Sequence, residues 1–368
     1  MSEPANLLRP RGLTQGVAAA ALAGPEELAR RQGAAALVRL GSNESPYGPS
    51  PGALTALHAE AGRSHRYGDP SERILRDAIA RHHAIDVRNV TVGAGIDDLL
   101  GWIVRAYLAP GEPAIAGLGS FPTFEMHANG YEADLQRVPY RADGRLDLDG
   151  LLRAAGPRGG LIFFPNPDNP SGSVYPWRDV VAFLDALPPK TLVIHDEAYA
   201  NFLPPPLRFP PDAVDPRMIR LRTFSKEYGL AGLRVGYAIA DATAIEALDA
   251  LRLLYGVSRP AQAAAVAALE DRVHVATVVA RTAEGRAEYA ALGRRLGIAV
   301  LPSVTNFVLF DLGSAPRAVA AQRALLEAGI HVRKPPEPPL DRCIRVSVGA
   351  PAGRAAFAAA LERFVAAG

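Results

Sequence analysis

Thr223-Phe224-Ser225-Lys226, continued as Glu227-Tyr228-Gly229-Leu230-Ala231-Gly232-Leu233-Arg234-Val235-Gly236-Tyr237, is the stretch from which the rest of the chain can be interpreted. The sequence has 40 lysine and arginine residues, yet only Lys190, Lys226 and Lys334 are lysine. An arginine stays protonated, whereas a lysine can lose its proton and act as an amine nucleophile. Lys226 lies in a Ser/Thr/Gly-rich turn just after an apolar run, so it is a candidate Schiff-base lysine. The alternative is a plain surface charge, which we expect for Lys190 and Lys334 beside prolines.

The composition restricts the class of protein. A chain of 368 residues, 49% hydrophobic and 21% charged, predicts a soluble globular protein of two domains. The net charge of +2 argues against a nucleic-acid partner. The single cysteine, Cys343, excludes an internal disulfide and favours a reducing cytoplasm. No apolar run approaches the ~20 residues that span a bilayer, and Arg9, Arg11 and the short Ala-rich run Val17–Ala23 make only a weak signal-peptide pattern.

Short apolar segments alternate with amphipathic ones through the first two thirds of the chain. Strands are expected at 90–92, 114–116, 135–138, 160–164, 191–194, 218–221 and 234–240, and helices at 71–83, 96–108, 121–129, 148–155, 177–186 and 242–254. The Pro- and Gly-rich segments 40–51 and 65–70 are expected to be irregular loops. This alternation predicts an α/β fold with a mostly parallel central sheet, buried on both faces by helices.

The pattern changes after Tyr255-Gly256-Val257-Ser258-Arg259-Pro260. Two Ala-rich helices at 261–269 and 274–296 precede strands at 307–310, 331–333 and 344–348, with a helix at 318–328 and another at the end. We therefore expect an N-terminal arm (1–40), a large domain (41–258) and a smaller α+β C-terminal domain (259–368).

Candidate functional residues follow the strands, because ligands of open α/β sheets bind beyond the carboxyl ends of the strands. Gly93-Ala94-Gly95-Ile96-Asp97 opens a helix and can cradle a phosphate, although a Gly-rich turn before a helix is often only a tight turn. Asp196 ends a buried strand and needs a cationic partner, unless it is a structural aspartate. Asn169 could be a plain turn residue, and Arg234 could make a surface salt bridge.

Together these groups suit one cofactor, pyridoxal 5'-phosphate. Lys226 would form the Schiff base, and Asp196 would pair with the pyridine nitrogen and keep it protonated. Tyr199 and Asn169 could hydrogen-bond the ring oxygen. The expected phosphate ligands are the backbone amides of Gly95, Ile96 and Asp97, the hydroxyls of Thr223 and Ser225, and Arg234.

From about Leu40 to its C-terminus the chain resembles the fold-type-I, class I/II aminotransferases, and it is most similar to the histidinol-phosphate aminotransferase family. The resemblance rests on motifs in a specific order: Asn43-Glu44-Ser45-Pro46-Tyr47-Gly48, Arg66-Tyr67, Gly93–Asp98, Asn166-Pro167-Asp168-Asn169-Pro170-Ser171-Gly172, Asp196-Glu197-Ala198-Tyr199, Thr223–Lys226 with Leu230–Gly236, and Arg345-Val346-Ser347-Val348-Gly349. It implies a homodimer with shared active sites.

The resemblance also implies roles for individual residues. Phe124 matches the aromatic side chain that stacks on the cofactor ring, and Tyr67 a tyrosine that reaches the cofactor phosphate of the neighbouring subunit. Arg345 matches the arginine that binds the acidic group of the substrate, with Arg333 as a second arginine. Tyr47 and Asn43 are the other substrate-binding candidates. The chain departs from the family in two places: Ala18–Ala23 carries no aromatic residue where the arm of the family usually has one, and Phe124 stands where tyrosine is commoner.

The implied reaction is transamination between an amino donor, histidinol phosphate or an aromatic amino acid, and 2-oxoglutarate, with ping-pong kinetics and a role in histidine biosynthesis. Three alternatives stay open at this point. They are an aminotransferase for aromatic amino acids only, an amino-acid-phosphate decarboxylase of the threonine-phosphate type, and a non-catalytic regulatory protein that binds pyridoxal phosphate. No metal ion is expected in any of them.

Overall fold

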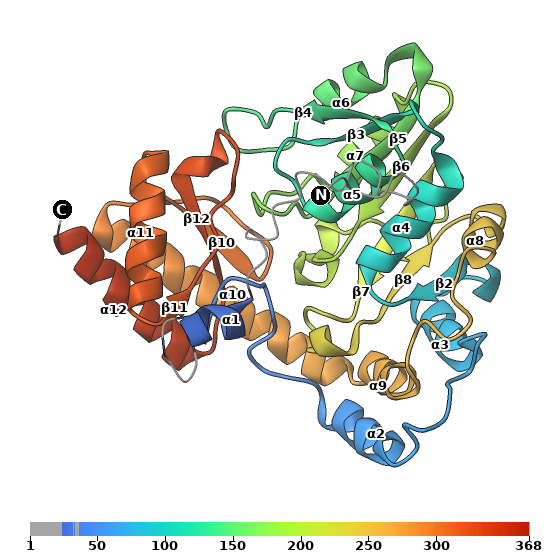
Figure 1. Cartoon of the computed structure of the whole chain (residues 1–368), viewed down its shortest axis with the longest axis horizontal. Helices are drawn as coiled ribbons and strands as arrows, with labels where there is room; N and C mark the ends of the chain where they lie inside the picture. Colours follow the sequence, from blue (N-terminus) through green and yellow to red (C-terminus); the bar gives the residue numbers. More distant parts are fainter. Residues whose placement is uncertain (1–23, 32, 34–36, 368) are drawn as a thin grey trace, which may run out of the picture.

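The structure, a computed structural model, describes residues 24–31, 33 and 37–367 (Figure 1). The helices are α1 (Pro25–Arg31), α2 (Pro51–Ala61), α3 (Arg73–His83), α4 (Ile96–Tyr107), α5 (Pro122–Gly130), α6 (Leu148–Ala155), α7 (Trp177–Asp185), α8 (Ala242–Asp249), α9 (Arg259–Glu270), α10 (Arg272–Leu296), α11 (Ala315–Glu327) and α12 (Pro351–Ala366). The strands are β1 (Val38–Arg39), β2 (Val90–Gly93), β3 (Pro113–Gly117), β4 (Asp134–Val138), β5 (Gly160–Pro165), β6 (Thr191–Asp196), β7 (Met218–Thr223), β8 (Gly236–Ile239), β9 (Ala299–Val300), β10 (Phe307–Asp311), β11 (Ile330–His331) and β12 (Cys343–Ser347). The weak signal-peptide pattern and the segment Ala18–Ala23 lie outside the described residues.

The large domain is built on a seven-stranded sheet of order β2-β8-β7-β6-β5-β3-β4. Strands β3 to β7 run parallel, and only β8 runs antiparallel to both of its neighbours, β2 and β7. The predicted α/β fold with a mostly parallel sheet is confirmed. Because the parallel strands point the same way, their carboxyl ends meet at one edge, where ligands of such sheets bind.

Helices cover both faces of this sheet (Figure 1). Along β5, Leu161 and Phe163 pack on one side with residues of α4, α5 and α8, whereas Ile162 and Phe164 pack on the other side with α6 and α7. Successive side chains of a strand point to opposite faces, so the unbroken apolar run in β5 is what a strand buried on both faces requires. None of the helices in the described residues is both long and apolar enough to cross a lipid bilayer.

The small domain contains the antiparallel sheet β12-β10-β9 and the short parallel pair β1–β11. Its core joins residues of α10, α11 and α12 to β10 and β12. Leu40, at the end of the predicted arm, is buried in this core. In Figure 1 the long helix α10 runs from the large domain into the small one, most of which is coloured orange to red.

The structure places the domain boundary later than residue 259. Ala261, Ala265 and Leu269 of α9 are buried with residues of α2, α3 and β2, so α9 belongs to the large domain. Within α10, Tyr289 and Leu292 are the first residues buried in the core of the small domain. The Ala-rich composition of α9 and α10 made the two helices look alike, although they pack into different cores.

The irregular loop expected at 40–51 is present up to Ser50, but helix α2, which begins at Pro51, was not predicted. Ser50 Oγ accepts a hydrogen bond from Ala53 N at 3.2 Å, and Pro51 occupies the first turn. The helix expected at 71–83 begins two residues later, at Arg73, so Ser71 precedes α3 and Glu72 is its N-cap. Asp69 accepts from the backbone N–H of Arg73 at 2.8 Å, so an aspartate four residues earlier pairs the exposed helix end.

Candidate active site

A cavity of about 790 Å³ opens at the carboxyl ends of the parallel strands, between the two domains. Most of the predicted site residues line it: Asn43, Ile96, Asp97, Asn169, Asp196, Tyr199, Thr223, Ser225, Lys226, Arg234, Arg333 and Arg345. They come from segments more than 300 residues apart in the chain. The size suits a small organic ligand, and it leaves room for more than one.

One end of the cavity is an anion cradle made by the N-terminus of α4 and the turn after β7. Gly95 caps α4 with a φ of 91°, which favours glycine. A Cβ on Gly95 would lie 2.5 Å from Arg234 Nη2, so the guanidinium can reach the helix end only because residue 95 has no side chain. Arg234 Nη1 donates to Ser225 Oγ at 3.4 Å, and Ser225 N donates to Thr223 Oγ1 at 3.0 Å. These groups surround the N–H groups that a helix leaves unpaired in its first turn.

One acid shares this cradle. Asp97 Oδ2 accepts from Arg234 Nη2 at 3.3 Å, and the two side chains are 47% and 48% exposed. Asp97 Oδ1 is buried and has no hydrogen-bond partner in the described part of the chain. An ion pair this exposed contributes little free energy, so a phosphate can replace Asp97 as the partner of Arg234.

The carboxylate of Asp196 is buried at the end of β6. Burial raises the pKa of Asp196 to about 7, although the hydrogen bond from Ala198 N and the charge of Lys226 lower it. The bond from Ala198 N to Asp196 Oδ1 is 2.9 Å long. A carboxylate held in this way favours a cationic N–H ligand in the cavity, since such a ligand would restore its charge.

Lys226 and Tyr199 face one another across the cavity floor. Lys226 Nζ lies 5.6 Å from the centre of the Tyr199 ring. The Tyr199 hydroxyl accepts from Asn43 Nδ2 at 3.0 Å, and Asn43 is held in turn by Ser347, whose Oγ donates to Asn43 Oδ1 at 2.9 Å. The phenol is therefore oriented by a buried network that reaches β12 of the small domain.

Two arginines form the small-domain wall. Arg345 Nη1 donates to Asn169 Oδ1 at 2.5 Å and Nη2 to the Gly41 carbonyl at 2.8 Å, while Arg345 Nε is buried without a hydrogen-bond partner among the described residues. Arg333 pairs with Arg345 through an antiparallel backbone bridge. Burial lowers the pKa of both arginines. Two cations that lose hydration side by side make this wall an anion-binding surface.

The lysine beside them differs from Lys226. Lys334, expected at the surface, contributes to the cavity wall. Its Nζ donates to the carbonyls of Pro335 at 3.0 Å and Asp341 at 3.1 Å. These bonds hold the amine against two backbone carbonyls, so Lys334 is a structural donor and not a second nucleophile.

The structure does not bring Phe124 of α5 to the cavity. Phe124 is fully buried in the core, where its ring stacks on Phe163 with centroids 5.3 Å apart and an interplanar angle of 12°. Phe121, which sequence reasoning missed, lines the cavity instead. Helix α5 begins at Pro122, so Phe121 precedes the helix while Phe124 turns inward with its first turn. The sequence signal for Phe121 is its position three residues before Phe124, since either aromatic side chain could have faced the cavity.

Two predicted tyrosines also lie outside the cavity lining. Tyr47 packs against the aromatic cluster of Tyr199, Phe202 and Phe307, with Arg281 5.4 Å over its ring, so the structure does not bring it to the substrate side. Tyr67 is 75% exposed and stacks on Tyr255 with centroids 4.3 Å apart.

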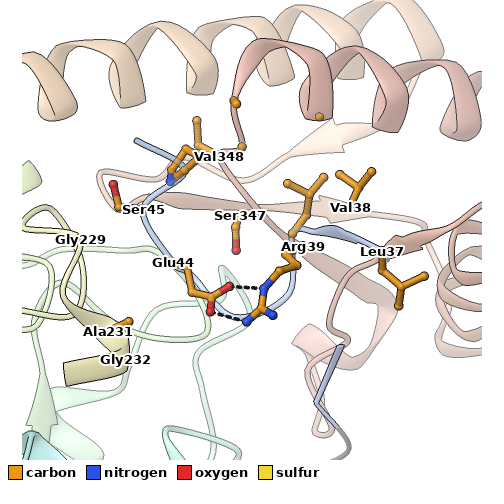
Figure 2. Close-up of a pocket in the computed structure, with 15 residues that line it drawn as sticks. Leu37, Val38, Arg39, Glu44, Ser45, Gly229, Ala231, Gly232, Ser347 and Val348 are labelled. Carbon is orange, nitrogen blue, oxygen red and sulfur yellow. Dashed lines mark hydrogen bonds and ion pairs between the residues drawn. The ribbon is translucent and has the colours of Figure 1, made fainter. Parts of the chain in front are cut away.

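A second cavity, of about 500 Å³, lies between residues 37–46, the loop 229–232 and the start of α12. Figure 2 shows Glu44 there, turned towards Arg39, and the two side chains form a double hydrogen bond. Glu44 lines both cavities. Because its carboxylate is already held by Arg39, Glu44 is a poor candidate for a substrate-binding acid.

Comparison with known proteins agrees with this geometry. The sequence model of the aminotransferase class I and II family matches residues 35–364. The chain belongs to the class I and II aminotransferase family. Histidinol-phosphate aminotransferase 1 of Mesorhizobium japonicum is 38% identical over 344 residues, covering 92% of this chain and 93% of that protein. The histidinol-phosphate aminotransferase of Anaeromyxobacter sp. is 36% identical, covering 88% and 90%.

A solved aminotransferase structure has the same fold. The histidinol-phosphate aminotransferase of Sinorhizobium meliloti, in complex with pyridoxal-5'-phosphate, is 41% identical with a TM-score of 0.93, and 99% of each chain is covered. An aspartate aminotransferase of Thermus thermophilus, at 23% identity and a TM-score of 0.80, shares the fold. The predicted aminotransferase family, fold type and enzyme class are confirmed.

Proposed function

We propose that this aminotransferase uses pyridoxal 5'-phosphate to move the amino group of histidinol phosphate to 2-oxoglutarate, as a step of histidine biosynthesis. One observation carries the proposal: an amine, a buried carboxylate of raised pKa and a phosphate cradle meet in a single cavity, at Lys226, Asp196 and the N-terminus of α4. Relatives named histidinol-phosphate aminotransferase support the choice of donor.

The residues present fit the cofactor. Asp196 would pair with the pyridine nitrogen, and the cradle of Gly95, Ile96, Asp97, Thr223, Ser225 and Arg234 would hold the phosphate. Asn169 and Tyr199 would hydrogen-bond the ring oxygen, and Phe121 would cover a ring face. When bound, the cofactor supplies an electron sink for the α-carbon of the substrate.

The protein supplies covalent attachment, orientation and proton transfer. Lys226 Nζ would bind the aldehyde of the cofactor, be released by the amino donor, and then accept the proton of the donor's α-carbon. Tyr199, fixed by Asn43, would keep the ring oxygen in place. Because one ketone product leaves before the 2-oxo acid enters, the kinetics should be ping-pong.

The two arginines would recognise both substrates. Arg345 can make a bidentate contact with a phosphate or carboxylate, and Arg333 lies beside it in the same wall. Histidinol phosphate and 2-oxoglutarate both carry such an anionic group, whereas a donor without one would leave the buried Nε of Arg345 without a hydrogen-bond partner among the described residues.

We also propose that the active enzyme is a homodimer in which Tyr67 reaches the cofactor phosphate of the partner subunit. The exposed, flat stack of Tyr67 on Tyr255 and the exposed side chains of Leu253 and Leu254 support a surface that another copy covers. A cytoplasmic location, expected from the single cysteine, stays a prediction.

Turnover of a panel of donors with 2-oxoglutarate tests the function. Histidinol phosphate should give the highest kcat/KM among histidinol phosphate, phenylalanine, tyrosine and threonine phosphate. A preference for phenylalanine or tyrosine would make the chain an aromatic aminotransferase, and evolved carbon dioxide from threonine phosphate would make it a lyase. Binding of the cofactor with no turnover of any donor would favour a regulatory protein.

Replacing Lys226 by Ala tests the attachment site. The variant should lose turnover and the visible absorption band that borohydride removes from the parent protein. Lys334→Ala is the matched control, because Lys334 lines the same cavity but its amine is held by carbonyls. A Lys226→Ala variant with an unchanged, borohydride-sensitive band would overturn the assignment.

A further inference from the structure

A buried polar network lies behind β6, which ends at Asp196, and β7, which leads into the loop of Lys226. His195 and Arg220 are register partners on β6 and β7, and alternate residues of each strand point to opposite faces. Arg220 and Arg222 therefore point away from the side that Asp196 lines. Glu197 accepts two hydrogen bonds from Arg220, at 3.0 and 3.2 Å, and its carboxylate lies 3.7 Å from Arg222.

Asn201 links this network to the loop of Lys226. Its Oδ1 accepts from Arg222 Nη2 at 2.9 Å, and its Nδ2 donates to Glu227 Oε1 at 2.6 Å. The same Nδ2 lies 3.3 Å from the Tyr228 hydroxyl. The amide therefore bridges a strand residue to both residues that follow Lys226.

The backbone of Asn201 is anchored next to Tyr199, which lines the cavity. It lies in the 3₁₀ turn Ala200–Phe202, which follows Tyr199 directly. Arg208 Nη2 donates to the Asn201 carbonyl at 3.1 Å. One residue thus connects the turn that carries the Tyr199 phenol to the loop that carries the Lys226 amine.

Glu227 depends on this link. It is buried, its Oε2 has no hydrogen-bond partner among the described residues, and Asn201 is the donor to its Oε1. Burial raises the pKa of Glu227 to about 7, while a hydrogen bond from its own backbone N–H, Arg222, Asn201 and Lys226 lower it. A buried carboxyl that loses its side-chain donor must move or change its protonation, and either response shifts the adjacent backbone of Lys226.

We propose that Asn201 is a positioning residue: by joining Glu227 to Arg222 it fixes where the Lys226 amine stands relative to Tyr199 and the cofactor site. The inference rests on the proposed function of Lys226, since it concerns the alignment of that amine. It assigns Asn201 no contact with substrate or cofactor, because Asn201 does not line the cavity.

Two vitamin B6 phosphates separate alignment from binding. Pyridoxal phosphate needs the Lys226 amine to form its covalent bond, whereas pyridoxamine phosphate has no aldehyde and needs only the cradle and Asp196. In the full-length apoprotein, Asn201→Ala should slow the appearance of the visible band by about 10- to 100-fold, the size expected for a reacting group misplaced by about 1 Å. Its dissociation constant for pyridoxamine phosphate should stay within twofold of the parent value.

Steady-state kinetics give a second readout. Asn201→Ala should lower kcat by a similar factor and leave the KM for the donor near its parent value, because the arginine wall is untouched. Glu227→Gln keeps an oxygen that accepts from Asn201 and should behave like the parent, whereas Glu227→Ala should behave like Asn201→Ala. Asn89→Ala is the matched control. Asn89 is a half-buried asparagine distant in sequence from Asn201, and its Nδ2 donates to the Ala240 carbonyl at 2.8 Å.

The outcomes are distinct. Equal losses of pyridoxal and pyridoxamine phosphate binding in Asn201→Ala would mean a general structural role and overturn the proposal, as would parent-like uptake in both Asn201→Ala and Glu227→Ala. If Asn201→Ala does not fold, Glu227→Ala and Glu227→Gln decide the question alone. A parent protein that forms no borohydride-sensitive band would instead overturn the proposed function.

Discussion

Asp196 and Glu197 are neighbours in the chain, both buried, and the protein treats their carboxylates in opposite ways. Burial raises the pKa of Asp196 to about 7. Burial alone would raise the pKa of Glu197 as well, but Arg220 and Arg222 outweigh it and lower this pKa to about 2. Asp196 lines the cavity, and Glu197 lies against two arginines behind it.

The difference separates groups that serve a ligand from groups that serve the fold. Glu197 is paired completely within the chain, because a buried charge without a partner costs several kcal/mol. The cavity groups are paired incompletely: Asp196 has one backbone donor to Oδ1, and Arg345 Nε has no partner in the part of the chain that the structure describes. These incompletely paired cavity groups therefore destabilise the folded apoprotein, and a ligand that pairs with them restores the lost free energy.

The largest effect should come from removing the Glu197 carboxylate, which pairs with Arg220 and Arg222. Glu197→Ala leaves the fully buried guanidinium of Arg220 without a carboxylate, so the apoprotein should lose about 3–5 kcal/mol of unfolding free energy. Urea denaturation of the apoprotein measures it. Asp196→Ala, one residue away on the cavity side, is the control and should cost much less. Equal losses in the two variants would remove the distinction between the faces.

Much of the cavity could be predicted from the sequence, whereas the pairing of Glu197 with Arg220 and Arg222 could not. Asp196 and Lys226 follow short apolar strands, and the ends of parallel strands meet whatever the helices between them do. The cluster behind them could not be predicted: Arg220 lies in the strand expected at 218–221 and Arg222 directly after it, and nothing in the sequence says which acid faces them.

Two other errors also arose from packing contacts between residues distant in sequence. Phe121 and Phe124 are both aromatic, and only the packing of α5 on the sheet buries Phe124 and leaves Phe121 at the cavity. The Ala-rich face of α9 suits either core, so the domain boundary depended on contacts with α2 and α3 that are distant in sequence. Ser50-Pro51, in contrast, was a local start signal for α2, hidden only by the Pro- and Gly-rich residues around it.

The pH dependence of the unfolding free energy tests whether the Asp196 carboxylate lacks a partner in the folded apoprotein. The folded-state pKa of Asp196 is raised from 3.8 to about 7, so its neutral form favours folding below about pH 4 and this contribution is lost as pH rises to 7. Asp196→Asn removes the titration. In the apoprotein, the stability of the variant relative to the parent should therefore grow with pH by at most about 1.4 kcal/mol per pH unit.

The relevant measurement is the difference between two urea midpoints at pH 5, 6, 7 and 8. A difference is needed because Glu72 and Glu227, whose pKa values burial also raises to about 7, change stability in the same window in both proteins. Asp212→Asn, which replaces an exposed carboxylate outside the cavity, is the matched control. A flat difference for Asp196→Asn would show that its carboxylate is stabilised within the chain, like that of Glu197.

The smallest effect should come from Asp97, which combines features of both faces: it is ion-paired, yet it lies at the ligand cradle. Because Asp97 and Arg234 are about half exposed, their pair should be worth about 0.2–1 kcal/mol. Asp97→Asn frees Arg234, removes a negative charge near the phosphate site and keeps the backbone amide of residue 97. The dissociation constant for pyridoxamine phosphate, measured by calorimetry at low salt, should fall by about twofold to fivefold, and the gain should shrink as salt screens the charges.

Asp98→Asn is the matched control, since Asp98 lies at the same helix end but accepts from Ala94 N instead of pairing with Arg234. Weaker binding in Asp97→Asn than in Asp98→Asn would mean that the Asp97 carboxylate orients Arg234 for the phosphate, which would place Asp97 with Glu197 among the groups that serve the fold.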